Sequence, residues 1–363
     1  MKQVIFLKSK GKISKGFKIT ISTLLFSVAV FSVSQRLFEC FTSERPALMA
    51  ASFTLADGRY KPDTKKPTEI TEETTSVQET VKAETTKPKL RDKSDYYDSY
   101  AEHEGEAKYA VEERFIGQTG TSVENCYVKN KTGLEIDFRE SLNSPLTFEV
   151  EKNSDSPQVL IYHTHTSESY MDEDVDYFYE SYYSRTQNTD FSVVSVGNIL
   201  CEKLNEKGIN TIHDTTVHDS TYNGSYDRSM QTIESNLNEY KDIKVVLDIH
   251  RDAIGTDECK VKPVFTYDGK KGAQIMILSG CDYYGEMGFE SWQENLKFAM
   301  KLQNTAETMY PGMTRPLSFD YFAYNEYVCD GSLLIEVGAE ANSIEQSEYT
   351  AELLANVLYE VLK

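Results

Sequence analysis

Short apolar runs alternate with amphipathic segments through the C-terminal part of the chain. Runs rich in Val, Ile and Leu, too short for buried helices, predict buried strands at 159–162, 243–249 and 333–337. Apolar residues recur at helical spacing in the segments 191–207, 226–240, 292–309 and 347–362. This alternation predicts an α/β fold with a mostly parallel, twisted sheet flanked by helices.

Weaker patterns add smaller elements. In residues 134–138 apolar and polar residues alternate, which predicts a strand. Gly208 is a stop signal for the preceding helix, and residues 209–213 after it predict a short strand. The runs 263–267 and 274–278, separated by a segment containing Asp268-Gly269, predict a hairpin or ribbon.

The N-terminus carries a basic segment followed by an apolar one. Lysines gather within residues 1–18. The segment 19–38 is long enough to span a bilayer if the Lys and Arg side chains at its ends reach the membrane surface. We expect a cytoplasmic tail at 1–18, an uncleaved transmembrane signal anchor at 19–38, and the rest of the chain outside the cell. A cleaved signal peptide is the alternative, with a late cleavage site at 47–51.

The segment that follows is polar. It is rich in Thr, Glu, Lys and Pro with little aliphatic periodicity, which predicts a disordered spacer at 39–116 and a catalytic domain at 117–363. His103 falls within this predicted spacer, where we expect it to be exposed and without a function.

Charge and cysteine content narrow the possible functions. The net charge of −20 argues against binding nucleic acid through its phosphates. Six scattered cysteines without a C-x-x-C spacing argue against a cysteine-rich zinc site. Buried free thiols are favoured over one or two disulfides, whose pairing the sequence does not reveal.

The candidate chemistry lies where the three predicted strands end. His163, His165 and Glu168 follow the first strand, His250 ends the second, and Glu336 lies within the third. Sites in open α/β sheets form at the carboxyl ends of strands. Imidazole and carboxylate are the ligands of Zn²⁺ sites that keep one position open for water. The sequence therefore predicts a zinc hydrolase.

We assign the ligands to His163, Glu168 and His250. His163 is preferred because it comes directly off the strand, but the spacing leaves His165 open as the alternative. Glu336 sits in an aliphatic run, where an unpaired carboxylate is costly, and is predicted to be the general base.

The neighbouring polar residues could have several roles. Asp248 and Asp252 could orient an imidazole or cap the following segment, and Arg251 could bind a substrate carboxylate or pair with one of these aspartates. His213 and His218 are more plausibly hydrogen-bonded or surface residues than ligands. The insert 171–183 is acidic and aromatic, and it could overhang the site and stack on sugar rings or be an ordinary loop.

Further matches carry a resemblance to a known family. They include Asn130-Lys131-Thr132-Gly133, Val196-Gly197, 248–253, Tyr310-Pro311-Gly312, and 334–338 with Asn342. In this order they resemble stage II sporulation protein P, a family of membrane-anchored peptidoglycan hydrolases of spore-forming bacteria.

The resemblance implies a zinc amidase-like fold and the wider class of zinc-dependent N-acetylmuramoyl-L-alanine amidases, in which the residue matching Glu336 is the base. It also implies endopeptidase cleavage of cross-links, septal wall remodelling during engulfment, and stage II sporulation proteins D and M as partners. His165, Arg251 and Asn342 are further candidates for substrate contact.

Two rival functions remain. One is another extracytoplasmic zinc peptidase, such as a carboxypeptidase, and the other is a non-catalytic scaffold of an engulfment complex. The chain has no G-x-S-x-G, Walker or nucleotide-binding glycine pattern, so a serine or nucleotide mechanism has no support.

Overall fold

The computed structural model describes residues 103, 105–117 and 119–363. The predicted basic tail, the signal anchor and most of the spacer lie outside the described residues. Within the described part, no helix is both long and apolar enough to cross a membrane.

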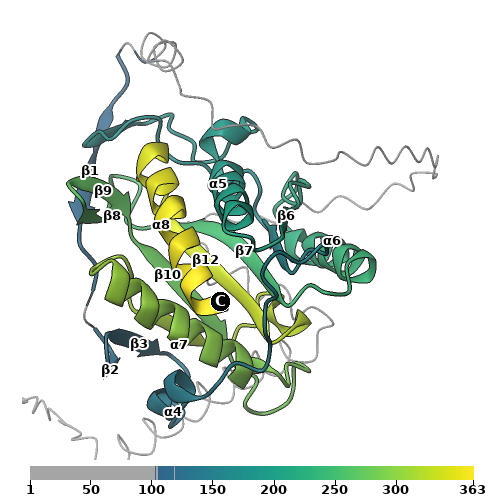
Figure 1. Ribbon diagram of the computed structural model, residues 1–363. Helices are drawn as coiled ribbons and strands as arrows, with labels where there is room; N and C mark the ends of the chain where they lie inside the picture. The colour runs from purple at the N-terminus through teal and green to yellow at the C-terminus, as the bar shows by residue number, and fades with distance from the viewer. Residues whose placement is uncertain (1–102, 104, 118) are drawn as a thin grey trace, which may run out of the picture. The chain divides into compact units, whose positions relative to one another are not determined.

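The domain is built on an eight-stranded mixed sheet (Figure 1). Its strands, in spatial order, are β2 (Thr121–Val123), β3 (Cys126–Asn130), β11 (Leu317–Asp320), β10 (Ile275–Gly280), β12 (Gly331–Ala339), β7 (Val245–Asp252), β4 (Val159–Tyr162) and β6 (Thr211–His213). All neighbours pair in parallel except β2 with β3 and β10 with β12. The predicted α/β class and mostly parallel sheet are therefore confirmed.

Helices cover the two faces of this sheet unequally. The helices α5 (Val193–Glu206), α7 (Trp292–Met309) and α8 (Ile344–Leu362) pack on one face, as Figure 1 shows. Together with alternate strand residues such as Ile161, Leu247 and Ile335, they form the main hydrophobic core. The opposite residues of β4 and β7 pack in a smaller core against α6 (Ser225–Glu239). The strand ends thus present side chains to two different environments.

Two of the three helices that pack on one face of the sheet, α5 and α8, begin where polar side chains cap them. The Ser192 hydroxyl accepts a hydrogen bond from the backbone N–H of Val194 at the start of α5. Ser343 and Gln346 form a capping box at the start of α8. These caps determine where two of the helices that cover this face of the sheet begin.

A second sheet has four strands, of which the sequence analysis predicted only the one at 263–267. The sheet is ordered β5 (Tyr177–Tyr179), β1 (Lys108–Arg114), β8 (Cys259–Tyr267) and β9 (Lys270–Ala273). The expected hairpin partner at 274–278 was wrong, because that run forms β10 of the main sheet and the partner in the hairpin is β9. The strand β1 of the second sheet lies inside the predicted spacer, so the folded domain starts before residue 117. Its strand β5 lies within the insert 171–183, so residues 177–179 of this insert pair with β1 and the insert is not wholly a loop.

Two local expectations were also wrong. Residues 134–137 form no strand, because Asp137 caps the short helix α4 (Phe138–Asn143) by accepting from the Glu140 N–H. His103 is not exposed but partly buried, because its ring stacks on Tyr179 with centroids 4.2 Å apart and its Nδ1 bonds Glu106. Two 3₁₀ turns, Thr189–Phe191 and Glu326–Val328, complete the described elements.

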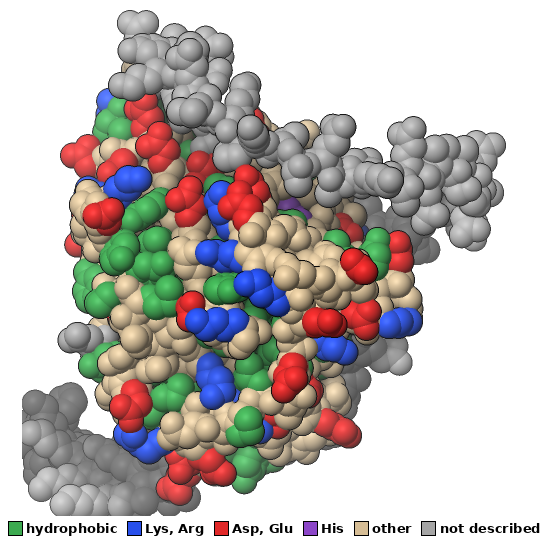
Figure 2. Space-filling model, viewed as in Figure 1, with side chains coloured by type: hydrophobic (Ala, Val, Ile, Leu, Met, Phe, Trp, Pro, Cys, Tyr) green, Lys and Arg blue, Asp and Glu red, His purple; other side chains and the backbone are tan. Residues whose placement is uncertain are grey.

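The prediction of free thiols is confirmed for the described cysteines, although only Cys126 and Cys281 are buried. Within the described part, Cys126, Cys201, Cys259, Cys281 and Cys329 are free thiols. On the face that Figure 2 shows, Lys and Arg side chains are scattered among acidic ones and form no continuous basic surface.

Candidate functional site

Parallel pairing of β7 and β12 brings two candidate residues side by side. Glu336 lies opposite His250 in the register of these strands. Asp248 and His250 are two positions apart, so their side chains leave β7 on the same face. This face is the one that α6 covers in part, away from α5 and α8.

The turn after β4 adds the remaining candidates. Thr164 fixes it, because its backbone N–H and its hydroxyl both donate to the Asp248 carboxylate, at 2.9 and 2.7 Å. The turn places the His165 ring 5.4 Å from the His250 ring, centroid to centroid, in an edge-on arrangement. The Glu168 N–H donates to the His165 carbonyl at 3.1 Å, which closes the turn.

Glu168, His250 and Asp248 form a buried row. The Nδ1 atom of His250 lies 3.4 Å from Glu168 Oε2, and its Nε2 lies 2.8 Å from Asp248 Oδ1. The second contact is ionic and not a well-aligned hydrogen bond, because Nε2 has no hydrogen-bond partner in the structure. Asp248 thus holds one side of the imidazole while the other faces Glu168.

The electrostatics of this row suit a cation. Burial lowers the pKa of His250, but the Asp248 and Glu168 carboxylates outweigh it and raise that pKa well above its usual range. Burial raises the pKa of Glu168, yet Arg251 and His250 hold it well below its usual range. Burial lowers the pKa of His165 to about 4, so this imidazole is neutral at pH 7. Neutral imidazole and ionised carboxylate are the forms that bind metals. His165 and Glu168 are in those forms, whereas His250, which the two carboxylates favour as a cation, would release a proton on binding one.

Glu336 differs from the other carboxylates. Its Oε2 is buried and has no hydrogen-bond partner in the structure. Burial, together with the Asp252 carboxylate, raises the pKa of Glu336 to about 8, although His250 opposes this. A carboxyl group with a pKa near neutrality is suited to accepting and returning a proton at pH 7.

These residues fit a zinc ion by their chemistry, although they do not form a preassembled metal site. In the described part of the chain, no cluster of three or more His, Cys, Asp or Glu is close enough to hold a metal. However, His165 Nδ1 is a buried polar atom without a partner, and it belongs to a group of two imidazoles and a carboxylate. This donor set is that of a hydrolytic zinc site.

His163, the preferred ligand of the sequence analysis, lies elsewhere. Its Nδ1 donates to the Ile249 carbonyl at 2.7 Å, and its Nε2 lies 2.7 Å from His213 Nε2. Strand alternation explains this, because His163 continues the face of Ile161 toward α5. Both ring nitrogens are therefore occupied on the side of the sheet away from Glu336. The structure brings together His165, Glu168, His250 and Glu336, without His163.

Other candidates are engaged in structural contacts. Arg251 does not pair with Asp248 or Asp252, because its guanidinium bonds the Ser169 and Ser184 carbonyls and lies 3.8 Å from Glu168. The buried Asn342 side chain donates to the Pro263 carbonyl and accepts from the Ala339 N–H. Both residues position the backbone around the site.

The remaining histidines and aspartates also have partners. His218 is buried and its Nδ1 lies 2.7 Å from the His163 carbonyl oxygen, so the expectation that it is hydrogen-bonded is confirmed. Asp252 accepts from the Ala253 N–H and pairs with Arg315 at 2.7 Å.

Aromatic side chains that the sequence analysis missed surround His165. Tyr222 stacks on its ring at 4.8 Å, and Tyr226 contacts it edge-on at 5.8 Å. Tyr324 lies 6.0 Å from Tyr226, on a turn where Tyr324 and Asn325 both have positive φ, at 41° and 61°. Such strain in two successive non-glycine residues is typical of functional sites, but it has no sequence signature.

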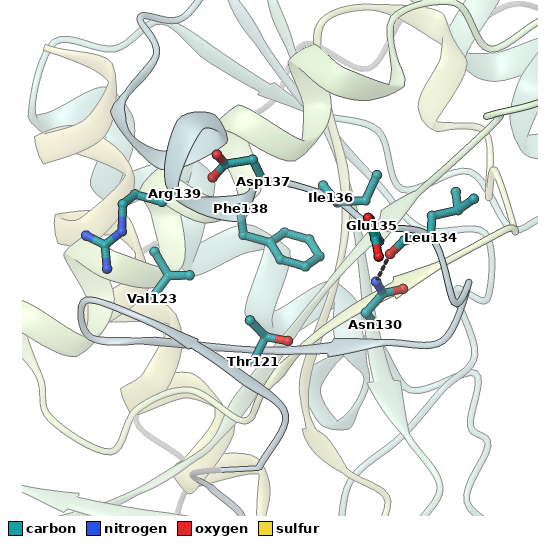
Figure 3. Close-up of a pocket in the computed structure, with 9 residues that line it drawn as sticks. All are labelled: Thr121, Val123, Asn130, Leu134, Glu135, Ile136, Asp137, Phe138 and Arg139. Atoms are coloured by element: carbon teal, nitrogen blue, oxygen red, sulfur yellow. Dashed lines mark hydrogen bonds between the residues drawn. The ribbon is translucent and has the colours of Figure 1, made fainter.

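A hollow on the surface lies apart from this cluster. Asn130, Leu134, Phe138 and other residues line it (Figure 3), and the Asn130 amide donates to the Leu134 carbonyl there. None of the candidate site residues lines this hollow.

The fold and the cluster define a class: an α/β domain with imidazoles and carboxylates gathered where parallel strands end. Comparison with known proteins then identifies the family. The chain belongs to the stage II sporulation protein P family, whose pattern matches residues 42–359. The resemblance seen in the sequence is confirmed.

A curated relative is the stage II sporulation protein P of Bacillus subtilis (strain 168), which is 27% identical over 228 residues. The match covers 58% of this chain and 52% of that protein, so it spans about half of the relative's length.

Among solved structures, the chain is similar to the CwlD amidase from Clostridioides difficile in complex with the GerS lipoprotein. That match has 13% identity and a TM-score of 0.34, and covers 56% of this chain and 96% of the other. An N-acetylmuramoyl-L-alanine amidase from Clostridium difficile 630 matches with 17% identity and a TM-score of 0.33, over 58% of this chain and 96% of the other.

Proposed function

We propose that this protein is a zinc-dependent peptidoglycan hydrolase that cleaves the amide between N-acetylmuramic acid and L-alanine. The observation that carries the proposal is the pairing of a buried, unpartnered carboxylate oxygen on Glu336 with the His165–Glu168–His250 group beside it. Membership of the stage II sporulation protein P family supports the choice of peptidoglycan as substrate.

Three side chains would hold the zinc ion: His165, Glu168 and His250. Asp248 keeps the His250 ring in place from behind, as carboxylates commonly do for zinc-binding imidazoles. Arg251 and the Thr164 contacts keep the carboxylates of Glu168 and Asp248 from turning away. A bound zinc ion supplies Lewis acidity toward the amide carbonyl and makes a nearby water more acidic.

Glu336 would be the general base. Its free Oε2 accepts a proton from the attacking water and then delivers it to the leaving amine. The pKa of about 8 would fall when a cation lies close by, which leaves the carboxylate ionised and ready to accept.

We place the domain outside the cell, on a single membrane anchor at 19–38 with the N-terminus in the cytoplasm. The lysine bias of residues 1–18 supports this orientation. By family, the protein would remodel septal wall during engulfment, together with stage II sporulation proteins D and M, and would also cut peptide cross-links.

Digestion of purified cell wall followed by mass spectrometry tests the proposal. The protein should release sugar chains without peptide, and additional cleavage of cross-links would reveal endopeptidase activity. Trimmed peptides still attached to sugar would instead indicate a carboxypeptidase. An absence of any new product from zinc-loaded protein would favour a scaffold and contradict the proposal.

A further inference from the structure

Arg315 is a buried cation whose hydrogen-bonding capacity is only partly used. It is 4% exposed, and its Nη1 pairs with Asp252 Oδ2 at 2.7 Å. Its Nε and Nη2 are both buried and have no hydrogen-bond partner in the structure. Leaving the edge of a buried guanidinium without an acceptor is costly, so this edge requires an explanation.

Arg315 lies beside the proposed base. Its backbone N–H donates to the carbonyl of Ile275, which pairs with Val337, the neighbour of Glu336. Its partner Asp252 lies two residues beyond His250 on β7 and opposite Ala339. The Arg315 charge also opposes the rise in the pKa of Glu336.

The contrast with Arg251 shows that the free edge of Arg315 is unusual in this site. Arg251 is equally buried, but its Nε and Nη2 bond the Ser169 and Ser184 carbonyls and its Nη1 faces Glu168. Arg251 is therefore committed to holding the fold. The arginine that can bind a substrate group is Arg315, which no sequence pattern singled out.

Glu336 is not the missing partner of this edge. Its Oε2 is itself without a hydrogen-bond partner, so Arg315 acts on Glu336 through its charge and not through a bond to this oxygen. A general base must keep a lone pair free for a proton. The free edge of Arg315 is therefore available to a bound ligand.

We propose that the Nε–Nη2 edge of Arg315 binds a carboxylate of the wall peptide, and so orients the scissile amide beside Glu336. Arginine presents two parallel N–H groups that match the two oxygens of a carboxylate. The backbone around Arg315 is fixed, since the Gln303 side chain of α7 donates to its carbonyl. This inference rests on the proposed function.

The test uses two soluble wall tripeptides that begin with L-alanine, one with a free carboxylate on the second residue and one with that group amidated. Both are products of the proposed reaction, so calorimetry measures their binding without turnover. We expect the zinc-loaded protein to prefer the free carboxylate by about 10- to 100-fold. Arg315→Gln should abolish this preference, and Arg315→Lys should restore part of it.

Controls separate this role from folding. Arg139, an exposed arginine paired with Glu124, is the matched control, and Arg139→Gln should keep the full preference. If Arg315→Gln does not fold, the double variant Arg315→Gln with Asp252→Asn removes both charges and should fold without the preference. Asp252→Asn alone should retain it.

Two outcomes would overturn the inference: a variant without Arg315 that still prefers the free carboxylate, or a wild-type protein without any preference. A rate on wall substrate that falls equally for free and amidated peptides would also overturn it, because Arg315 would then serve Glu336 alone. Failure of the proposed function is distinguishable, since a protein that releases no peptide from wall could still show the Arg315-dependent preference.

Discussion

The two sides of the sheet at the end of β4 carry histidines used in opposite ways. On the side of α5, His163 and His213 contact each other, and their other ring nitrogens bond Ile249 and Asn198. On the opposite side, His165 has an unpartnered Nδ1 and lies near Glu168 and His250. Satisfied polar groups stabilise a fold, whereas unsatisfied ones that persist indicate a ligand. Two histidines separated by one residue thus have different roles.

We call the side with the His163–His213 pair the closed side and the side with His165 the open side. Gly197, in α5, lies on the closed side. A Cβ atom at this position would lie 2.5 Å from His213 Nε2 and 2.9 Å from His163 Nε2. The histidine pair therefore requires glycine in the middle of α5, despite its poor helix propensity.

The largest expected effect is on the open side, at Glu336. Glu336→Gln keeps the shape of the side chain but removes the proton acceptor, so turnover of wall substrate should fall by about 10² to 10⁴. Zinc content and binding to wall should remain, as measured by elemental analysis and co-sedimentation. Glu340→Gln, which changes a glutamate paired with Lys260, is the matched control and should retain activity. A Glu336→Gln protein with wild-type turnover would remove this residue from the mechanism.

The next effect is on the closed side. Gly197→Ala should destabilise the domain by about 1–3 kcal/mol through overpacking, of which the better helix propensity of alanine returns up to about 1 kcal/mol. Urea unfolding measures the change, and the zinc content of the folded protein should not alter. In a His213→Ala background the same substitution should cost less, because one clash is gone. An equal cost in both backgrounds would contradict the packing described here.

A smaller effect is expected at Asp248, which lies on the same face as His250. Asp248→Asn leaves an acceptor for Thr164 but removes the charge beside His250 Nε2. Zinc affinity, measured by competition with a chelating dye, should fall about 10- to 100-fold. Asp252→Asn on the same strand should change the affinity much less. Unchanged affinity in Asp248→Asn would show that Asp248 does not support the ligand.

Much of the fold could be predicted because it is encoded locally. The strand at 159–162 and the helix at 292–309 have the bounds that their patterns indicated. The four-stranded sheet could not be predicted, because its strand β1 pairs with β8, which lies far away in the sequence. The strand predicted at 134–138 was wrong because five residues that alternate between apolar and polar also suit a loop that leads into a helix.

The candidate site was predictable in part for a similar reason. Glu168, His250 and Glu336 could be found from carboxylates and an imidazole at the ends of apolar strands. The choice of His163 over His165 could not be made from spacing, because it depends on which face the chain presents after β4 ends. Arg315 has no motif around it, and only its burial and its unused hydrogen-bonding groups single it out.

The zinc content of two histidine variants tests the central claim most directly. Wild-type protein should carry about one zinc ion per chain when folded. His165→Ala should fold with nearly wild-type stability and lose the metal, whereas His163→Ala should be less stable but keep the metal in the molecules that fold. If His163→Ala instead loses zinc and His165→Ala retains it, the assignment of the open and closed sides is contradicted.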